Sequence, residues 1–222
     1  MPVKIKSFMV VVVAAVIMLF PWRAFASTAA EKAAASSPTQ QLKAGADNLI
    51  QVLKDQSLKT EEGKKLLEDK VVQLFHQHFD LTYTSQMCLG RYWRKLSKAE
   101  KKEFVDLFTE LLKSTYLKRV HEYSGQSVEY NKEIIKGRKA LVKTKFIDKG
   151  KEIPVDYKML NRDGQWRVYD VIVEGVSLVR NYRSQFSSIL RKKKFADLLD
   201  QIRDKIARNK AAKDVAGEPQ KG

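Results

Sequence analysis

The apolar residues of this 222-residue chain change their spacing twice, and this change limits the folds that the chain can adopt. Over residues 42–123 they recur every three to four residues, as on one face of a helix. Over residues 127–173 they fall in short runs rich in β-branched and aromatic residues, which is typical of strands. The helical spacing returns after Gly175 and ends in a last predicted helix at about 195–207. The order helices, strands, helices predicts an α+β protein.

The strand region divides into four runs, at residues 128–130, 140–147, 153–160 and 166–173. Each intervening turn contains a glycine, which suits the positive φ of tight hairpins. We therefore expect one antiparallel four-stranded meander sheet. The alternation of apolar residues in the third run leaves one apolar face for helices to cover.

The clearest helix signal follows Ser97. Ser97 and Glu100 form a capping box, in which each side chain accepts a hydrogen bond from the other residue's backbone N–H. Apolar residues then follow at the spacing of one helix face, from Phe104 to Tyr116. We expect this face to pack toward the sheet. Periodicity does not distinguish a filled core from a cavity, because the same apolar residues line both.

Residues 1–26 have the three parts of a secretory signal peptide. Lys4 and Lys6 precede an apolar run over residues 8–20, and an A-x-A pattern predicts cleavage after Ala26. The run is shorter than the about 20 residues that a membrane-spanning helix needs, so a signal peptide is favoured over a permanent anchor. Residues 27–39 are expected to form a flexible leader, residues 40–209 a single domain, and residues 210–222 a disordered tail.

The chain is strongly basic, with a formal net charge of +16. For an exported protein this charge favours anionic lipid head groups or acidic partner surfaces over nucleic acid. A solvated surface that aids solubility explains it equally well. The candidate contacts are Arg91, Arg94 and Lys95, together with the run at residues 191–194. That run lies at a predicted helix end, where the helix dipole also favours cations.

The sequence contains only incomplete catalytic motifs. Residues 175–179 begin like the nucleophile elbow of hydrolases, but the second glycine is absent and the predicted sheet is antiparallel. Ser177 is better interpreted as a residue that caps a helix N-terminus. Asp170, Glu174 and Arg183 could form an acid/base set. A charge pair with the helix after Gly175 explains them equally well, and we expect no enzyme activity.

Metal ligands and disulfides are also not expected. His76 and His78 lie two residues apart and lack the i, i+4 spacing of a helical zinc site, so we predict no metal and no other cofactor. Cys88 is the only cysteine, which excludes an intramolecular disulfide. Since it lies between Met87 and Leu89, we interpret it as a small core residue.

Two longer segments carry a family resemblance. The first is LGRYWRKLS at residues 89–97, followed by the apolar helix face, and the second is WRVYDVIVEGVSLV at residues 166–179, continued by NYRSQF at 181–186. Both resemble the MlaC family of periplasmic phospholipid carriers, over residues 42–206. Cys88 stands where a small residue such as Ala is expected. The resemblance implies a periplasmic protein that holds phospholipid acyl chains in an apolar cavity between sheet and helices.

The resemblance also implies candidate site residues and partners. The partners would be an outer-membrane lipoprotein complex and an inner-membrane ABC transporter with an MCE-type subunit, and lipid exchange between them would maintain outer-membrane lipid asymmetry. The basic contacts would be Arg91, Arg94, Lys95, Arg191, Lys192 and Lys193. The cavity would be lined by Phe104, Phe108, Leu111, Leu112, Tyr116, Ile153, Val155, Tyr157, Tyr169, Val171, Val173, Val176 and Val179.

Three alternatives remain open, of which the second comes from the family resemblance. The chain could be an adaptor of an ABC transporter with a solid core. It could belong to a hopanoid-associated branch of the family and carry no lipid of its own. It could also be an exported enzyme that uses the region of Ser177 or Asp170.

Overall fold

The structure is a computed structural model that describes residues 36–60, 62–117 and 125–217. The predicted signal peptide, its cleavage site and residues 27–35 of the predicted leader lie outside these residues. Among the residues described, no helix combines the length and the apolar character needed to cross a membrane.

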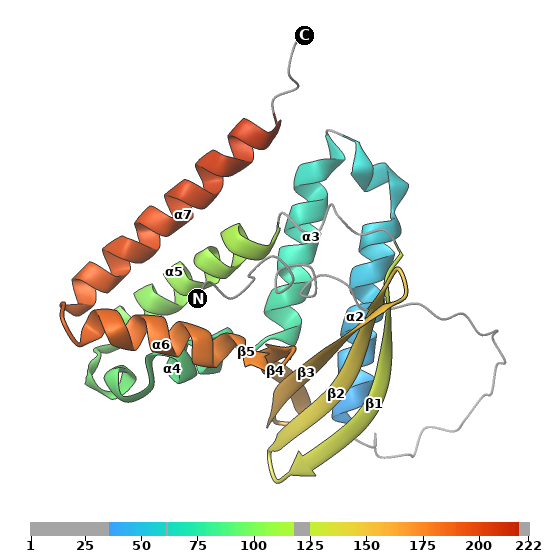
Figure 1. The fold of residues 1–222 in the computed structure, drawn as a ribbon, viewed down its shortest axis with the longest axis horizontal. Helices are drawn as coiled ribbons and strands as arrows, with labels where there is room; N and C mark the ends of the chain where they lie inside the picture. Colours follow the sequence, from blue (N-terminus) through green and yellow to red (C-terminus); the bar gives the residue numbers. More distant parts are fainter. Residues whose placement is uncertain (1–35, 61, 118–124, 218–222) are drawn as a thin grey trace, which may run out of the picture.

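Helices precede and follow one sheet, which confirms the α+β prediction (Figure 1). Before the sheet the chain forms α2 (Pro38–Lys54), η1 (Gln56–Lys59), α3 (Gly63–His78), α4 (Leu81–Leu89), η2 (Gly90–Lys95) and α5 (Lys98–Tyr116). After it come α6 (Leu178–Leu190) and α7 (Phe195–Gly217).

The ends of the domain extend beyond the predicted residues 40–209. Ser37 caps α2, since its Oγ accepts the Gln40 backbone N–H at 3.2 Å and the Gln40 side chain accepts the Ser37 N–H at 2.8 Å. Residues 38 and 39 are therefore helical and do not belong to a flexible leader. At the other end, α7 continues to Gly217, into the segment predicted to be a disordered tail. The S-x-x-Q capping box lies within a stretch that composition alone classified as leader.

The sheet has five antiparallel strands in the order β1-β2-β3-β4-β5, one more than predicted. They are β1 (Ser127–Lys136), β2 (Lys139–Asp148), β3 (Lys151–Arg162), β4 (Gln165–Val173) and β5 (Val176–Ser177). The fifth strand is too short to leave a periodic signal. It follows a tight turn in which Glu174 and Gly175 both have positive φ, 48° and 81°.

Two bulges interrupt the alternation of the sheet. In β1 the pairing with β2 shifts between Tyr130 and Lys132 and then continues to Lys136. The strand is therefore longer than the predicted run at 128–130. In β4 the pairing with β3 also shifts: Lys158 pairs with Asp170, and the next residue, Met159, pairs with Val168. Tyr169 is therefore the extra, unpaired residue of a bulge. Strict alternation would place Asp170 on the same face as Trp166. The bulge at Tyr169 places it on the opposite face instead.

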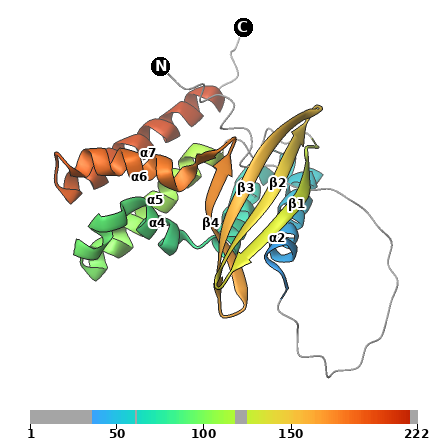
Figure 2. The same cartoon turned by 60° about the horizontal axis from the view of Figure 1, so that its bottom comes forward.

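Two main apolar clusters stabilise the fold. The first, which we call the helical core, joins α4, α5, α6 and α7 in a layer beside the sheet (Figure 1). The second, which we call the sheet core, comprises the apolar residues on the sheet face that α2 and α3 cover (Figure 2). A third, smaller cluster of Leu53, Leu58 and Leu67 holds α2, η1 and α3 together.

Candidate functional site

A cavity of about 190 Å³ is bounded by α2, α3, the C-terminal half of α5 and strands β3 and β4. Its walls are mostly aliphatic and aromatic. The α2 residues at the cavity are Gln41, Leu42, Gly45, Ala46 and Leu49. The α3 residues include Val71, Val72, Leu74 and Phe75, and the strand residues include Tyr157, Met159, Trp166, Val168 and Val171.

The N-terminal end of α2 is hydrogen-bonded to two strands of the sheet, β1 and β4. The Glu133 carboxylate on β1 accepts the Thr39 backbone N–H at 2.7 Å and the Ser37 hydroxyl at 3.1 Å. The Gln41 side chain accepts the backbone N–H of Trp166, at the start of β4, at 2.8 Å. These bonds hold α2 across the sheet and so fix one wall of the cavity.

The approach of α2 to α3 depends on Gly45. A Cβ at this position would lie 2.7 Å from the His78 ring, well inside van der Waals contact. Glycine therefore allows the His78 imidazole to pack directly on the α2 backbone. The two helices meet closely at this contact, and the apolar residues on either side of it face the cavity.

The polar groups of the wall are mostly bonded within the protein. Thr109 donates its hydroxyl to the Val105 carbonyl at 2.7 Å, and Thr84 donates to the carbonyls of Asp80 at 2.8 Å and Tyr169 at 3.0 Å. These hydroxyls are already satisfied, so the wall offers a ligand chiefly apolar contact.

Two ionisable side chains of the wall, Tyr157 and His78, are uncharged at pH 7 because they are buried. Burial raises the pKa of Tyr157 to about 12, and Tyr157 lines the cavity. Burial also lowers the pKa of His78 below 6.5, with a further decrease from the positive charge of Arg167. Lys113 and Asp170 also line the cavity, and Asp170 is paired with Lys158 at 3.2 Å. Most of the wall is nevertheless apolar, which is suited to an apolar ligand.

Five of the residues predicted for the cavity line it: Leu112, Tyr116, Tyr157, Tyr169 and Val171. The first two lie on the C-terminal half of α5, and the others lie on β3 and β4.

The other eight predicted residues lie elsewhere. The residues that fill the helical core are Phe104, Phe108, Leu111 and Val179. The residues that pack within the sheet core without lining the cavity are Ile153, Val155 and Val173. Val176 is 42% exposed, because the turn before β5 directs it to solvent. Apolar periodicity identified the buried faces correctly but not which part of each face meets empty space.

The sequence reasoning missed the walls that α2 and α3 supply. A signal for them existed, since Leu42, Gly45, Ala46 and Leu49 recur at i, i+3, i+4 and i+7. Gly and Ala on an otherwise apolar face are small residues, and small residues opposite a sheet leave space between the two surfaces.

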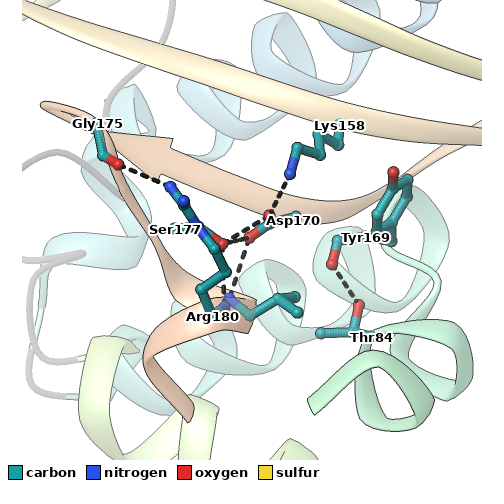
Figure 3. Close-up of polar contacts among 8 residues, drawn as sticks. Thr84, Lys158, Tyr169, Asp170, Gly175, Ser177 and Arg180 are labelled. Atoms are coloured by element: carbon teal, nitrogen blue, oxygen red, sulfur yellow. Dashed lines mark hydrogen bonds and ion pairs between the residues drawn. The ribbon is translucent and has the colours of Figure 1, made fainter. Parts of the chain in front are cut away.

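The Ser177 region is a structural junction (Figure 3). Ser177 caps α6, as predicted, since its Oγ accepts the Arg180 backbone N–H at 3.0 Å. The same hydroxyl donates to Asp170 at 2.8 Å, and Asp170 also accepts the Val179 N–H at 3.0 Å and pairs with Lys158 at 3.2 Å. The cation that pairs with Asp170 therefore comes from β3 and not from the helix after Gly175. Among the residues described, no histidine bonds to Ser177, so the arrangement is that of a helix cap.

Cys88 is fully buried in the helical core, which confirms its interpretation as a core residue. Burial raises the pKa of its thiol, and the negative charge of Asp170 raises it further. Within residues 36–60, 62–117 and 125–217, no group of three His, Cys, Asp or Glu side chains is placed to hold a metal ion.

The predicted basic contacts lie at the end of the helical layer that is remote from the sheet (Figures 1 and 2). Three are exposed on η2 and three follow α6. The ring of Phe195, just after the second group, lies 6.2 Å from Phe104 on α5. We call this surface the basic end, and it comprises Arg91, Arg94, Lys95, Arg191, Lys192 and Lys193.

Sequence comparison defines the class of protein. The model of the MlaC protein family matches residues 43–204, and this chain therefore belongs to the MlaC family.

Two curated proteins are similar to this chain. The intermembrane phospholipid transport system binding protein MlaC of Haemophilus influenzae is 23% identical over 175 residues, which cover 76% of this chain and 82% of that protein. The toluene tolerance protein ttg2D of Pseudomonas putida is 28% identical over 104 residues, which cover 46% of this chain and 48% of that protein.

A solved structure has the same fold. It is the phospholipid-binding protein of Ralstonia solanacearum in complex with a phospholipid, with a TM-score of 0.70 and 22% identity. The match covers 78% of this chain and 99% of the solved chain. The arrangement of helices and sheet described above is therefore shared with that protein.

Proposed function

We propose that this chain is a periplasmic carrier that binds phospholipid by its acyl chains in the cavity between α2, α3 and the sheet, without catalysis. The observation that carries the proposal is the predominantly apolar wall of that cavity. Membership of the MlaC family supports it, as does the phospholipid bound to the structural relative from Ralstonia solanacearum.

Apolar contact alone provides enough free energy to hold a lipid. Each methylene group removed from water contributes about 0.8 kcal/mol, so a chain of ten methylenes gains about 8 kcal/mol. No covalent step and no cofactor are required for this binding.

The size of the cavity implies that its walls separate when lipid enters. Its volume of about 190 Å³ is smaller than the roughly 300–1,000 Å³ of ordinary ligand pockets. A phospholipid with two acyl chains needs more space than this. We expect α3 and the C-terminal part of α2 to move away from the sheet, because the hydrogen bonds to Glu133 and Trp166 hold only the N-terminal end of α2.

The proposed route runs between an outer-membrane lipoprotein complex and an inner-membrane ABC transporter with an MCE-type subunit. Such exchange would maintain the lipid asymmetry of the outer membrane. The export pattern of residues 1–26 supports a periplasmic location. The exposed basic end offers a surface for brief, salt-sensitive contact with acidic partner surfaces.

Filling the cavity tests the proposal. Ala46 lines the cavity from α2, so Ala46→Trp should fill it and lower the amount of bound phospholipid. Ala44→Trp is the matched control, because Ala44 lies on the same helix, is exposed and does not line the cavity. Native mass spectrometry of each purified mature protein measures the bound lipid.

The outcomes of this experiment separate the alternatives. We expect phospholipid on the wild type and on Ala44→Trp, and much less on folded Ala46→Trp. If overpacking unfolds Ala46→Trp, Ala46→Phe provides a smaller filling residue. Equal lipid content in all folded variants would place the cargo elsewhere. A wild type without lipid, even after incubation with phospholipid vesicles, would favour the adaptor.

A further inference from the structure

The sheet face that points away from α2 and α3 carries lysine opposite lysine. In the pairing of β1 with β2, Lys132 lies directly opposite Lys143, and Lys136 lies directly opposite Lys139. Arg138 lies in the turn between the strands, and all five cations are exposed. Figure 2 shows β1 and β2 with α2 behind them. We call these five residues the basic hairpin.

The basic hairpin differs from the rest of this face, where cations have carboxylate partners. Lys145 pairs with Glu152 at 2.7 Å and Lys158 pairs with Asp170 at 3.2 Å. Within the hairpin, Arg138 donates to the Asn161 carbonyl at 3.1 Å and Lys139 lies 5.9 Å from the centre of the Tyr83 ring, and both of these partners are uncharged. In the part of the chain that the structure describes, none of the five hairpin cations forms an ion pair. Like charges directly opposite each other destabilise a sheet. Asp156 on β3 lies directly opposite Lys143 and offsets part of this cost at one of the two lysine pairs. The remaining repulsion costs stability in the isolated protein, and an external anionic surface would remove that cost.

We propose that the basic hairpin binds the surface of an anionic lipid membrane. Four of its five cations are lysines, whose compact charge does not demand a fixed partner geometry, whereas Arg is favoured for paired contacts with protein carboxylates. Mobile lipid head groups match such an array. Between the two lysine pairs, on the same face, lie Ile134 and Leu141, which are opposite each other and only half-buried. Cations interleaved with apolar side chains are typical of membrane-surface binding.

The basic hairpin is separate from the cavity and from the basic end. None of its residues lines the cavity, because they alternate with Ala140 and Val142, which face the sheet core. The basic end lies across the molecule, at the far end of the helical layer (Figure 1). Membrane binding and lipid cargo can therefore be measured independently.

Binding to vesicles tests the inference. The hairpin variant carries Lys132→Gln, Lys136→Gln and Lys143→Gln. The control variant carries Lys43→Gln, Lys65→Gln and Lys102→Gln, which remove the same charge from exposed lysines that are paired with aspartates on helices. Co-sedimentation is measured with vesicles of phosphatidylcholine, with and without phosphatidylglycerol.

We expect the wild type to prefer the anionic vesicles. Each lysine at a membrane surface contributes about a fivefold factor in affinity, so the hairpin variant should bind about 100-fold more weakly. The control variant should stay within a factor of about three, since only long-range charge changes. The hairpin variant should unfold at the same or a higher temperature, because the repulsion between lysines is relieved. Its lipid content should match the wild type.

Three results would overturn the inference. One is equal anionic-vesicle binding by the hairpin and control variants. Another is wild-type binding that is equally strong with and without phosphatidylglycerol in the vesicles. In that case an acidic protein would be the better candidate partner of the hairpin. The third is a loss found only when Arg91, Arg94 and Lys95 are neutralised, which would assign the membrane contact to the basic end. If the purified protein contains no lipid but still binds vesicles through the hairpin, the carrier function is rejected and the membrane-binding inference stands.

Discussion

The helical core and the cavity are both apolar spaces between packed elements, but one is filled and the other is not. In the helical core the Phe104 and Phe108 rings stack at 5.6 Å, and Tyr182 meets Phe108 edge to face at 4.9 Å. Phe186 contacts all three of these rings. At the cavity, α2 instead presents the small residues Gly45 and Ala46.

The difference shows that side-chain size, more than polarity, separates a stabilising core from a binding site. Interlocking aromatic rings reach across the gap between helices and exclude both water and ligand. At the cavity, Gly45 and Ala46 on α2 are too small to reach across the gap. The helix α5 takes part in both spaces, since its N-terminal and central part carries Phe104 and Phe108 in the helical core, and its C-terminal part carries Leu112 and Tyr116, which line the cavity.

The largest expected effect tests the filled space. Phe108→Ala should lower the free energy of unfolding by about 3–5 kcal/mol, because a buried ring is lost from close packing. Leu49→Ala, in the cavity wall, should cost about 2 kcal/mol or less, because Leu49 already lacks neighbours on its cavity side. Urea unfolding of the two variants measures the contrast. Equal losses would mean that the cavity wall is packed as tightly as the helical core.

An intermediate effect is expected at the junction of the two regions. Asp170→Asn should cost about 1–3 kcal/mol, because the charge that meets Lys158 is lost and an amide donor now faces donors. Ser177→Ala should cost about 0.5–2 kcal/mol through the lost helix cap. Since the two side chains bond each other, the double variant should lose less than the sum. Strict additivity in thermal or urea unfolding would show that the bond contributes nothing.

The smallest effect is expected from His78 and depends on pH. The pKa of His78 is lowered in the folded protein, so below about pH 6.5 the unfolded chain binds the extra proton more readily. The contribution of His78 to stability is therefore complete above that pH and falls as the pH decreases through it. His78→Gln should remove this part of the pH dependence and leave that of the carboxylates. The difference between the two urea-unfolding profiles measures it, and parallel profiles would contradict the expected environment of His78.

Much of the fold was predictable from local signals. The capping box before α5 forms as expected, with the Glu100 N–H bonded to Ser97 Oγ at 3.2 Å and the Ser97 N–H bonded to Glu100 at 2.8 Å. The hairpin turns with their glycines and the helix cap at Ser177 were also predicted from the sequence, because each depends only on neighbouring residues in the chain. The class of fold follows from the order of these elements.

The cavity was less predictable, because its shape depends on distances between elements. Phe104 and Leu112 belong to one periodic face and both pack in the helical core, yet only Leu112 also lines the cavity. Periodicity places both on the buried side and carries no information about what stands opposite. The bulge in β4 had the same effect on Asp170, whose face could not be assigned by counting residues.

That bulge has a consequence for how sequences of this family are compared. Tyr169 has no partner in β3, so a chain that lacks it could pair Asp170 with Lys158 and Val168 with Met159 as before. What would be lost is local: the edge contact of the Tyr169 and Tyr83 rings at 5.0 Å and the Thr84 bond to the Tyr169 carbonyl. A one-residue gap in an alignment therefore belongs at Tyr169, where strand length can vary without exchanging buried and exposed faces.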